Sequence, residues 1–187
     1  IDHIKTVIKR SLELAKNYDI NLDMVYVVAA YHDLGHYIDR KKHEIISAEM
    51  FMKDEKVKQW FIEEQRNTIK EAIEDHRASN TKEPRSIYGR VVLTADRNNS
   101  IEEFFKRRIK YCVEHHPEYT EDQVVSELYI SSTEKFGEEG YAFKKSCYMP
   151  SEKLEAYLQQ INRHLQNREE FEKRLKEHKI IWKSNVK

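Results

Sequence analysis

The sequence has few residues that interrupt helices and no excess of either charge. It contains four glycines and three prolines in 187 residues, and we find no convincing strand pattern. Few turn residues and a charged fraction of 35% favour long solvated helices over sheets. The 33 Lys and Arg balance the 33 Asp and Glu, so no general electrostatic attraction to nucleic acids or anionic membranes is expected.

Cysteine and long apolar runs are also scarce. Cys112 and Cys147 are the only cysteines, which is too few for a disulfide framework or a zinc motif. We interpret them as reduced thiols and expect a cytoplasmic protein. No apolar run reaches 18 residues, so we expect no membrane span, and the charged N-terminus does not resemble a signal peptide.

Hydrophobic periodicity predicts an all-α protein, a compact multi-helix bundle with a C-terminal helical extension. Asn21 or Asp23 can start the second helix. This helix is apolar all round, so we expect it to be the central buried helix, and we expect Gly35 to end it in a left-handed conformation. Capping patterns appear at Ser100 and Thr120. The expected helices cover residues 2–17, Met24–Tyr31, 43–52, 55–78 with a bend near Gln65 left open, Ser86–Asp96, a helix from Ser100, a helix from Thr120, and Ser151–His178.

Histidines and aspartates recur at inward-facing positions of these helices. His32 and Asp33 end the most apolar helix, where a carboxylate opposes the helix dipole. A buried carboxylate without compensation costs several kcal/mol, and a metal ion would compensate it. His3, His76 and Asp96 lie on the apolar faces of other expected helices. Each alone has an ordinary explanation as a core residue or a helix cap, but together they favour a shared site.

The ordered set resembles the HD-domain superfamily of metal-dependent phosphohydrolases over roughly residues 2–110. The motifs are His3 in "DHIKTV", the pair His32-Asp33 in "AAYHDLGH", His43 in "HEIISAEMF", His76 in "IEDHRAS" and Asp96 in "LTADR". The resemblance implies one ion held by His3, His32, Asp33 and Asp96, and a second held by Asp33, His43 and His76. It also implies a metal-binding helical domain over residues 1–110, with residues 111–187 as a helical extension packed on it.

The donor set narrows the metal and the chemistry. Imidazoles mixed with carboxylates suit Fe, Mn, Zn, Co or Ni better than Ca or Mg, and we expect one or two such ions. A bound ion would activate water, so no Ser or Cys nucleophile is required. We assign Asp33 as the bridging carboxylate, whereas the role of His36 stays open between proton donor, supporting partner and helix cap.

The resemblance implies a metal-dependent phosphohydrolase acting on a small phosphorylated substrate, which we expect to be a nucleotide. Candidate cations for the phosphate are Arg10, Arg77, Arg97 and Lys144. The sequence lacks a "GYP" element near the site, which argues against the cyclic-dinucleotide branch of the family.

Two alternatives remain open: a non-catalytic, metal-stabilised regulatory or binding module, and a helical scaffold whose histidines are core residues. The last helix carries a leucine-rich stripe that faces either the core or a partner, so a homodimer also stays open.

Overall fold

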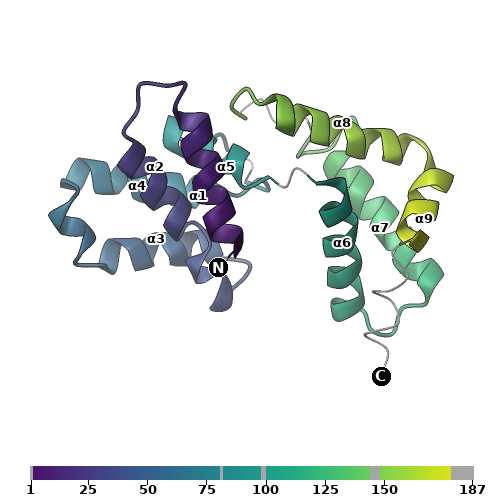
Figure 1. The fold of residues 1–187 in the computed structure, drawn as a ribbon. Coiled ribbons are helices and arrows are strands. Elements are labelled where there is room, and N and C mark those ends of the chain that lie inside the picture. The colour runs from purple at the N-terminus through teal and green to yellow at the C-terminus, as the bar shows by residue number, and fades with distance from the viewer. Residues whose placement is uncertain (1, 81, 98–99, 144–147, 178–187) are drawn as a thin grey trace. The chain divides into compact units, whose positions relative to one another are not determined.

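The computed structural model describes residues 2–80, 82–97, 100–143 and 148–177. Every regular element in these ranges is helical, which confirms the all-α class (Figure 1). The chain divides into two compact units, one formed by Ile1–Arg97 with Ser146–Ser151 and the other by Asn98–Lys145 with Glu152–Lys187. Each unit is described by itself, and the packing of residues 111–187 on the metal-binding domain stays a prediction.

The first unit is a helical bundle around one apolar core. In it α1 packs on α2 and α5, while α3 packs on α4. Fully buried core side chains include Val28, Phe51, Ile69, Ile73 and Val92. The elements are α1 (Asp2–Ala15), α2 (Leu22–Tyr31), the 3-10 helix η1 (Leu34–Tyr37), α3 (His43–Lys53), the 3-10 helix η2 (Val57–Gln59), α4 (Glu63–Asp75) and α5 (Ile87–Ala95).

The predicted start of α2 is confirmed, but its predicted burial is only partly right. Asn21 is the cap, and its side chain accepts hydrogen bonds from the backbone N–H groups of Asp23 and Met24. Val28 is fully buried, whereas Leu22 and Tyr26 are 43% and 49% exposed. The helix therefore packs on one side of the core rather than through its centre.

The prediction that Gly35 ends the second helix in a left-handed conformation is wrong. The second helix ends at Tyr31, and Gly35 lies inside η1 with no positive φ. A Cβ atom at Gly35 would lie 2.6 Å from the backbone oxygen of His43 and 2.9 Å from the backbone nitrogen of Ser47. Glycine is required here because α3 approaches this backbone too closely for any side chain.

Two long predicted helices are each divided. The expected helix over residues 55–78 consists of η2 and α4, separated near Ile62, three residues before the bend that we left open at Gln65. The expected helix from Ser151 to His178 consists of α8 (Glu152–Gln166) and α9 (Arg168–Glu177), and His178 lies outside the described residues. Hydrophobic periodicity continues across both breaks, so the sequence alone did not reveal them.

The second unit contains α6 (Ile101–His115), α7 (Glu121–Phe136), α8 and α9. Ser100 caps α6, and Thr120 and Gln123 form the predicted reciprocal capping box of α7. The stripe of the last predicted helix is buried, mostly on α8, which packs on α6, α7 and α9, and in part on α9, so it faces the core of this unit. The stripe residues are Leu154, Leu158, Ile161, Leu165 and Leu175.

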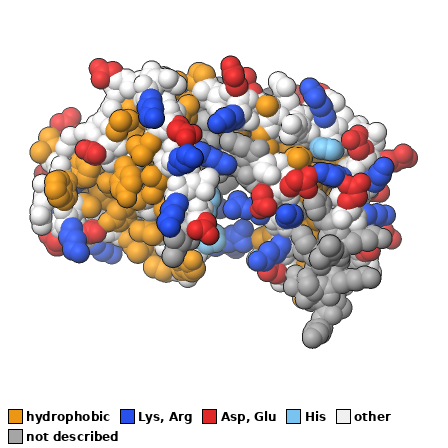
Figure 2. Space-filling view, viewed as in Figure 1, with side chains coloured by type: hydrophobic (Ala, Val, Ile, Leu, Met, Phe, Trp, Pro, Cys, Tyr) orange, Lys and Arg blue, Asp and Glu red, His pale blue; other side chains and the backbone are white. Residues whose placement is uncertain are grey.

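The surface of the first unit carries exposed hydrophobic side chains. Trp60 and Ile62 are 78% and 66% exposed, and Figure 2 shows hydrophobic side chains gathered on the face of this unit. Among the helices described, none combines the length and the apolar character needed to cross a bilayer. The homodimer that the sequence left open stays a prediction.

Candidate metal centre

The residues predicted as metal ligands all lie at or beside the ends of helices in the first unit. His3 is near the start of α1 and His43 is the first residue of α3. His32, His76 and Asp96 are the residues that directly follow α2, α4 and α5, and Asp33 precedes η1. The structure gathers these side chains into two adjoining groups, His3 with His32 and Asp96, and Asp33 with His43 and His76.

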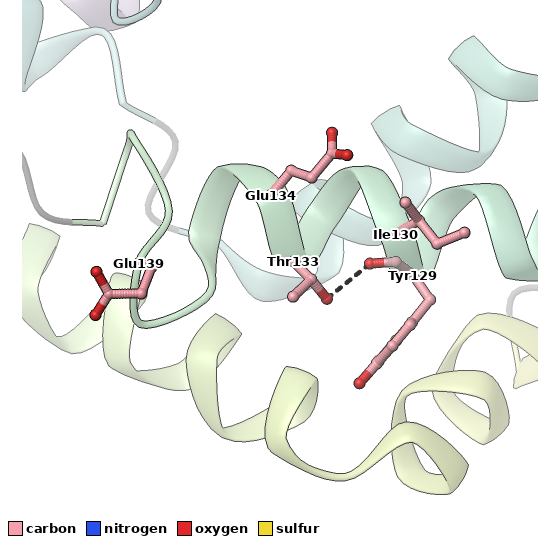
Figure 3. Close-up of a pocket in the computed structure, with 5 residues that line it drawn as sticks. All are labelled: Tyr129, Ile130, Thr133, Glu134 and Glu139. Atoms are coloured by element: carbon pink, nitrogen blue, oxygen red, sulfur yellow. Dashed lines mark hydrogen bonds between the residues drawn. The ribbon is translucent and has the colours of Figure 1, made fainter.

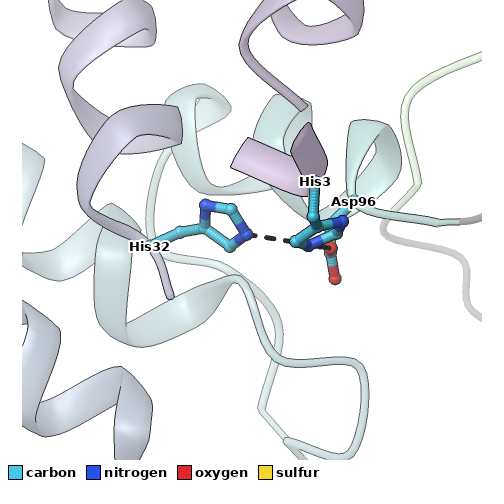
Figure 4. Close-up of side chains that lie close together, drawn as sticks. All are labelled: His3, His32 and Asp96. Atoms are coloured by element: carbon cyan, nitrogen blue, oxygen red, sulfur yellow. Dashed lines mark ion pairs between the residues drawn. The ribbon is translucent and has the colours of Figure 1, made fainter. Parts of the chain in front are cut away.

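The first group joins two imidazoles to one carboxylate. The Nε2 atom of His3 lies 3.1 Å from Oδ1 of Asp96, and Nε2 of His32 lies 3.8 Å from the same oxygen. Figure 4 shows both rings directed at this carboxylate. The ligand atoms of the three residues lie within 4.8 Å of one another, a separation that one metal ion can span.

The second group has the same composition. The Nε2 atoms of His43 and His76 lie 3.3 Å and 3.8 Å from Oδ1 of Asp33. The two Nε2 atoms lie only 3.2 Å from each other. Two imidazoles and a carboxylate oxygen therefore converge on a second small volume.

Asp33 connects the two groups through its two oxygens. Oδ1 faces His43 and His76, while Oδ2 lies 3.5 Å from Nε2 of His3 and 3.8 Å from Nε2 of His32. A carboxylate placed between two groups in this way has the arrangement needed to bridge two ions, and this role of Asp33 stays a prediction.

The backbone fixes the orientation of three of the imidazoles. In each, Nδ1 lies within hydrogen-bond distance of the carbonyl oxygen three residues earlier, where a helix end or turn leaves that oxygen available. Such a bond places the proton on Nδ1 and leaves the Nε2 lone pair free to bind a metal. The pairs are His32 with Ala29 at 2.7 Å, His43 with Arg40 at 2.9 Å, and His76 with Ile73 at 2.6 Å.

Two features fit these side chains to a cation. Nε2 of His32 is buried and has no hydrogen-bond partner, although burial of an unpaired polar atom is costly. With Nδ1 of His43 and His76 both donating to carbonyls, their Nε2 atoms present lone pairs to each other at 3.2 Å. A divalent ion would bind these lone pairs and remove the repulsion between them.

The ionisation states favour metal binding as well. Burial, and to a lesser extent the electrostatic interaction with His32, lower the pKa of His76 to about 4, so this imidazole is neutral near pH 7. Burial alone would raise the pKa of Asp96, but the hydrogen bond from His3 and the positive charge of Arg97 outweigh it and hold the pKa well below its ordinary value. Neutral imidazoles and ionised carboxylates are the forms that bind metals.

The three predicted arginines that the structure describes all have protein partners. Arg97 donates from Nη2 to Oδ2 of Asp96 at 2.9 Å, and Arg10 donates to the backbone oxygen of Arg97 at 3.1 Å. Arg77 donates to the carboxylate of Glu44 at 3.2 Å. Their binding of substrate stays a prediction.

Sequence reasoning did not single out Glu44. This carboxylate is only 9% exposed and lies on the inward stripe of α3 with Ser47, Ala48 and Phe51. The sequence "EIISAEMF" could have revealed it, because its first residue, Glu44, stands at i, i+3, i+4, i+7 spacing from the other residues of this stripe. An acidic residue on an apolar stripe needs a partner.

The remaining predicted site residues are less constrained. His36 is exposed, and its ring centroid lies 5.7 Å from that of His43. It is therefore close to the second group without joining it. Lys144 lies outside the described residues.

A hollow of about 400 Å³ in the second unit contains none of the predicted ligands (Figure 3). Glu134 and Glu139 are part of its lining, and Tyr129, Ile130 and Thr133 complete it. Two carboxylates repel a phosphorylated substrate, so this hollow does not suit the chemistry predicted for the histidines and aspartates.

A helical bundle that presents imidazoles and carboxylates from its helix ends to two adjoining points has the features of an α-helical metal-binding protein. A comparison with models of protein families identifies the family. The model described as HD domain matches residues 1–99, and the chain belongs to this family, a superfamily of metal-dependent phosphohydrolases. Neither the curated proteins nor the solved structures gave a match.

Proposed function

We propose that this protein is a phosphohydrolase that uses one or two divalent transition-metal ions to hydrolyse a small phosphorylated substrate, specifically a nucleotide. One ion is held by His3, His32, Asp33 and Asp96, and the other by Asp33, His43 and His76. The observation that carries the proposal is the shared carboxylate of Asp33, whose two oxygens face the two groups.

When bound, such ions polarise a phosphoryl oxygen and lower the pKa of water toward about 7. His32, His43 and His76 would hold the ions through their Nε2 lone pairs, and the carbonyls bonded to Nδ1 keep these three rings from turning. The carboxylates of Asp33 and Asp96 offset the positive charge that the ions introduce.

His36 is the residue that we assign to proton transfer. It lies beside the second group and is exposed, so it can exchange protons with solvent between turnovers. In this assignment His36 donates a proton to the leaving oxygen of the substrate. Replacing it should lower kcat and leave the metal content unchanged.

A non-catalytic, metal-stabilised module is the second candidate. Partial exposure of the ligands favours the enzyme: the side chains of His3 and Asp33 are 32% and 25% exposed, whereas that of His32 is fully buried. A purely structural site closes around its ion, while a catalytic site keeps one side open for water and substrate.

One experiment tests the proposal. The protein is purified without chelator or affinity metal, its transition metals are measured, and a panel of nucleotides and generic phosphate esters is screened for phosphate release. We expect bound metal and turnover of at least one nucleotide. Metal without turnover across the panel would favour the regulatory module, and a protein that neither contains nor takes up Mn²⁺ or Fe²⁺ would exclude both metal-binding functions.

A further inference from the structure

Each histidine of the second group is followed by a charged residue, and these two charged residues pair. Glu44 follows His43 at the start of α3, and Arg77 follows His76 just after α4. Nη1 of Arg77 lies 3.2 Å and 3.4 Å from the two carboxylate oxygens of Glu44. The same two helix ends therefore carry both the imidazole pair and an ion pair.

The burial of Glu44 makes this pairing necessary. Glu44 is 9% exposed, and its partner Arg77 is one-third exposed along its side chain. A carboxylate buried to this extent is strongly destabilising without a partner. Arg77 also donates to the backbone oxygen of Lys41 at 2.5 Å, which ties the segment leading into α3 to the end of α4.

Glu44 also reaches the imidazole beside it. Its Oε2 lies 3.3 Å from Nδ1 of His43, and the carbonyl oxygen of Arg40 lies 2.9 Å from the same nitrogen. Two acceptors at Nδ1 favour the tautomer with the proton on Nδ1. The lone pair of Nε2 then faces the lone pair of His76.

Facing lone pairs at 3.2 Å repel, so the helix ends need an attractive contact to keep the rings in place until an ion binds. We propose that Glu44 and Arg77 are positioning residues whose ion pair holds His43 and His76 at the spacing of a metal site. This proposal rests on the proposed metal site and concerns the second group alone. It gives Arg77 a role distinct from contact with phosphate.

The first group supplies a matched control. Arg97 pairs with Oδ2 of Asp96 and leaves Oδ1 directed at His3 and His32. An arginine therefore supports each group. Arg97 pairs directly with the candidate ligand Asp96, whereas Arg77 pairs with Glu44, the residue next to the candidate ligand His43. Changes at Arg77 and Arg97 should affect different ions.

The test measures metal binding in chelator-treated protein titrated with Co²⁺, followed by its absorption spectrum. We expect Glu44→Gln and Arg77→Gln to retain one ion with unchanged affinity and to bind the second roughly 10- to 100-fold more weakly, the usual effect of losing such a supporting contact. The double variant should be no worse than either single one. Arg77→Lys should recover part of the loss, while Arg97→Gln should weaken the other ion.

A second measurement does not depend on metal. Imidazole nitrogen NMR spectra of the chelator-treated protein should show His43 with its proton on Nδ1, and Glu44→Gln should mix the two tautomers. Circular dichroism identifies any variant that fails to fold, and Arg77→Lys then provides the comparison. If wild-type protein bound no metal, the proposed function would fail, and the tautomer of His43 would still decide whether Glu44 positions this ring.

Two results would overturn the inference. One is a Glu44→Gln protein that binds both ions like wild type and keeps the tautomer of His43 unchanged. The other is an Arg77→Gln protein with normal metal binding and a raised KM, because this combination indicates that Arg77 contacts the substrate.

Discussion

The shared carboxylate of Asp33 gives the sharpest prediction. Asp33→Asn keeps the size of the side chain and removes its negative charge. Oδ1 lies 3.3 Å from Nε2 of His43 and Oδ2 lies 3.5 Å from Nε2 of His3, so this one change affects both groups. A change at Asp96 or His76, by contrast, should affect one group directly.

The size of the effect follows from what a direct ligand contributes. Loss of a supporting partner typically costs 10- to 100-fold in affinity, so loss of a charged ligand should cost at least about 100-fold for each ion. A factor of 100 corresponds to about 2.8 kcal/mol of binding free energy. Phosphate release should fall in parallel, because activity depends on the same ions.

The assay titrates chelator-treated wild-type and Asp33→Asn proteins with Mn²⁺ and measures affinity and phosphate release in the same samples. Asp19→Asn is the matched control, since Asp19 is an exposed aspartate in the same unit and should change neither quantity. If Asp33→Asn bound two ions with wild-type affinity, Asp33 would not be the bridge and the assignment of both groups would be wrong.

Three further predictions follow from the fold. Gly35→Ala should destabilise the protein by about 1–3 kcal/mol and weaken binding of the second ion, because the added Cβ meets the backbone of His43. Thermal unfolding checks the first effect and metal titration the second. Removing metal with a chelator should lower Tm, and an ion at 1,000 times its Kd should restore about 4 kcal/mol of stability in calorimetry. Burial raises the pKa of the Cys112 thiol, so in a Cys147→Ser protein alkylation at pH 9 should be much slower in the folded than in the unfolded state; equal rates would contradict this.

The sequence predicted the helices and the ordered histidines and aspartates because both depend on local spacing. Inward position follows from periodicity, so His76 could be placed after Ile69, Ala72 and Ile73. The structure brings these residues together, and their binding of metal stays a prediction.

Tertiary contacts explain what the sequence could not predict. Gly35 looked like a conformational requirement, but it meets a steric one imposed by α3, which no local pattern reveals. The pairing of Arg77 with Glu44 joins residues 33 positions apart, so the sequence could offer Arg77 only as a cation near a ligand. The division between α8 and α9 falls at Asn167, within a continuous amphipathic pattern.

The placement of every candidate ligand at a helix end determines which changes in chain length the site tolerates. One residue inserted within α2 would turn His32 by about 100° relative to the buried face of the helix and direct it away from the first group. The same insertion in residues 16–20, between α1 and α2, would leave both helices and their end residues in register. Natural variation in length is therefore expected in the connections that precede the helices, while the number of residues within each ligand-bearing helix should stay constant.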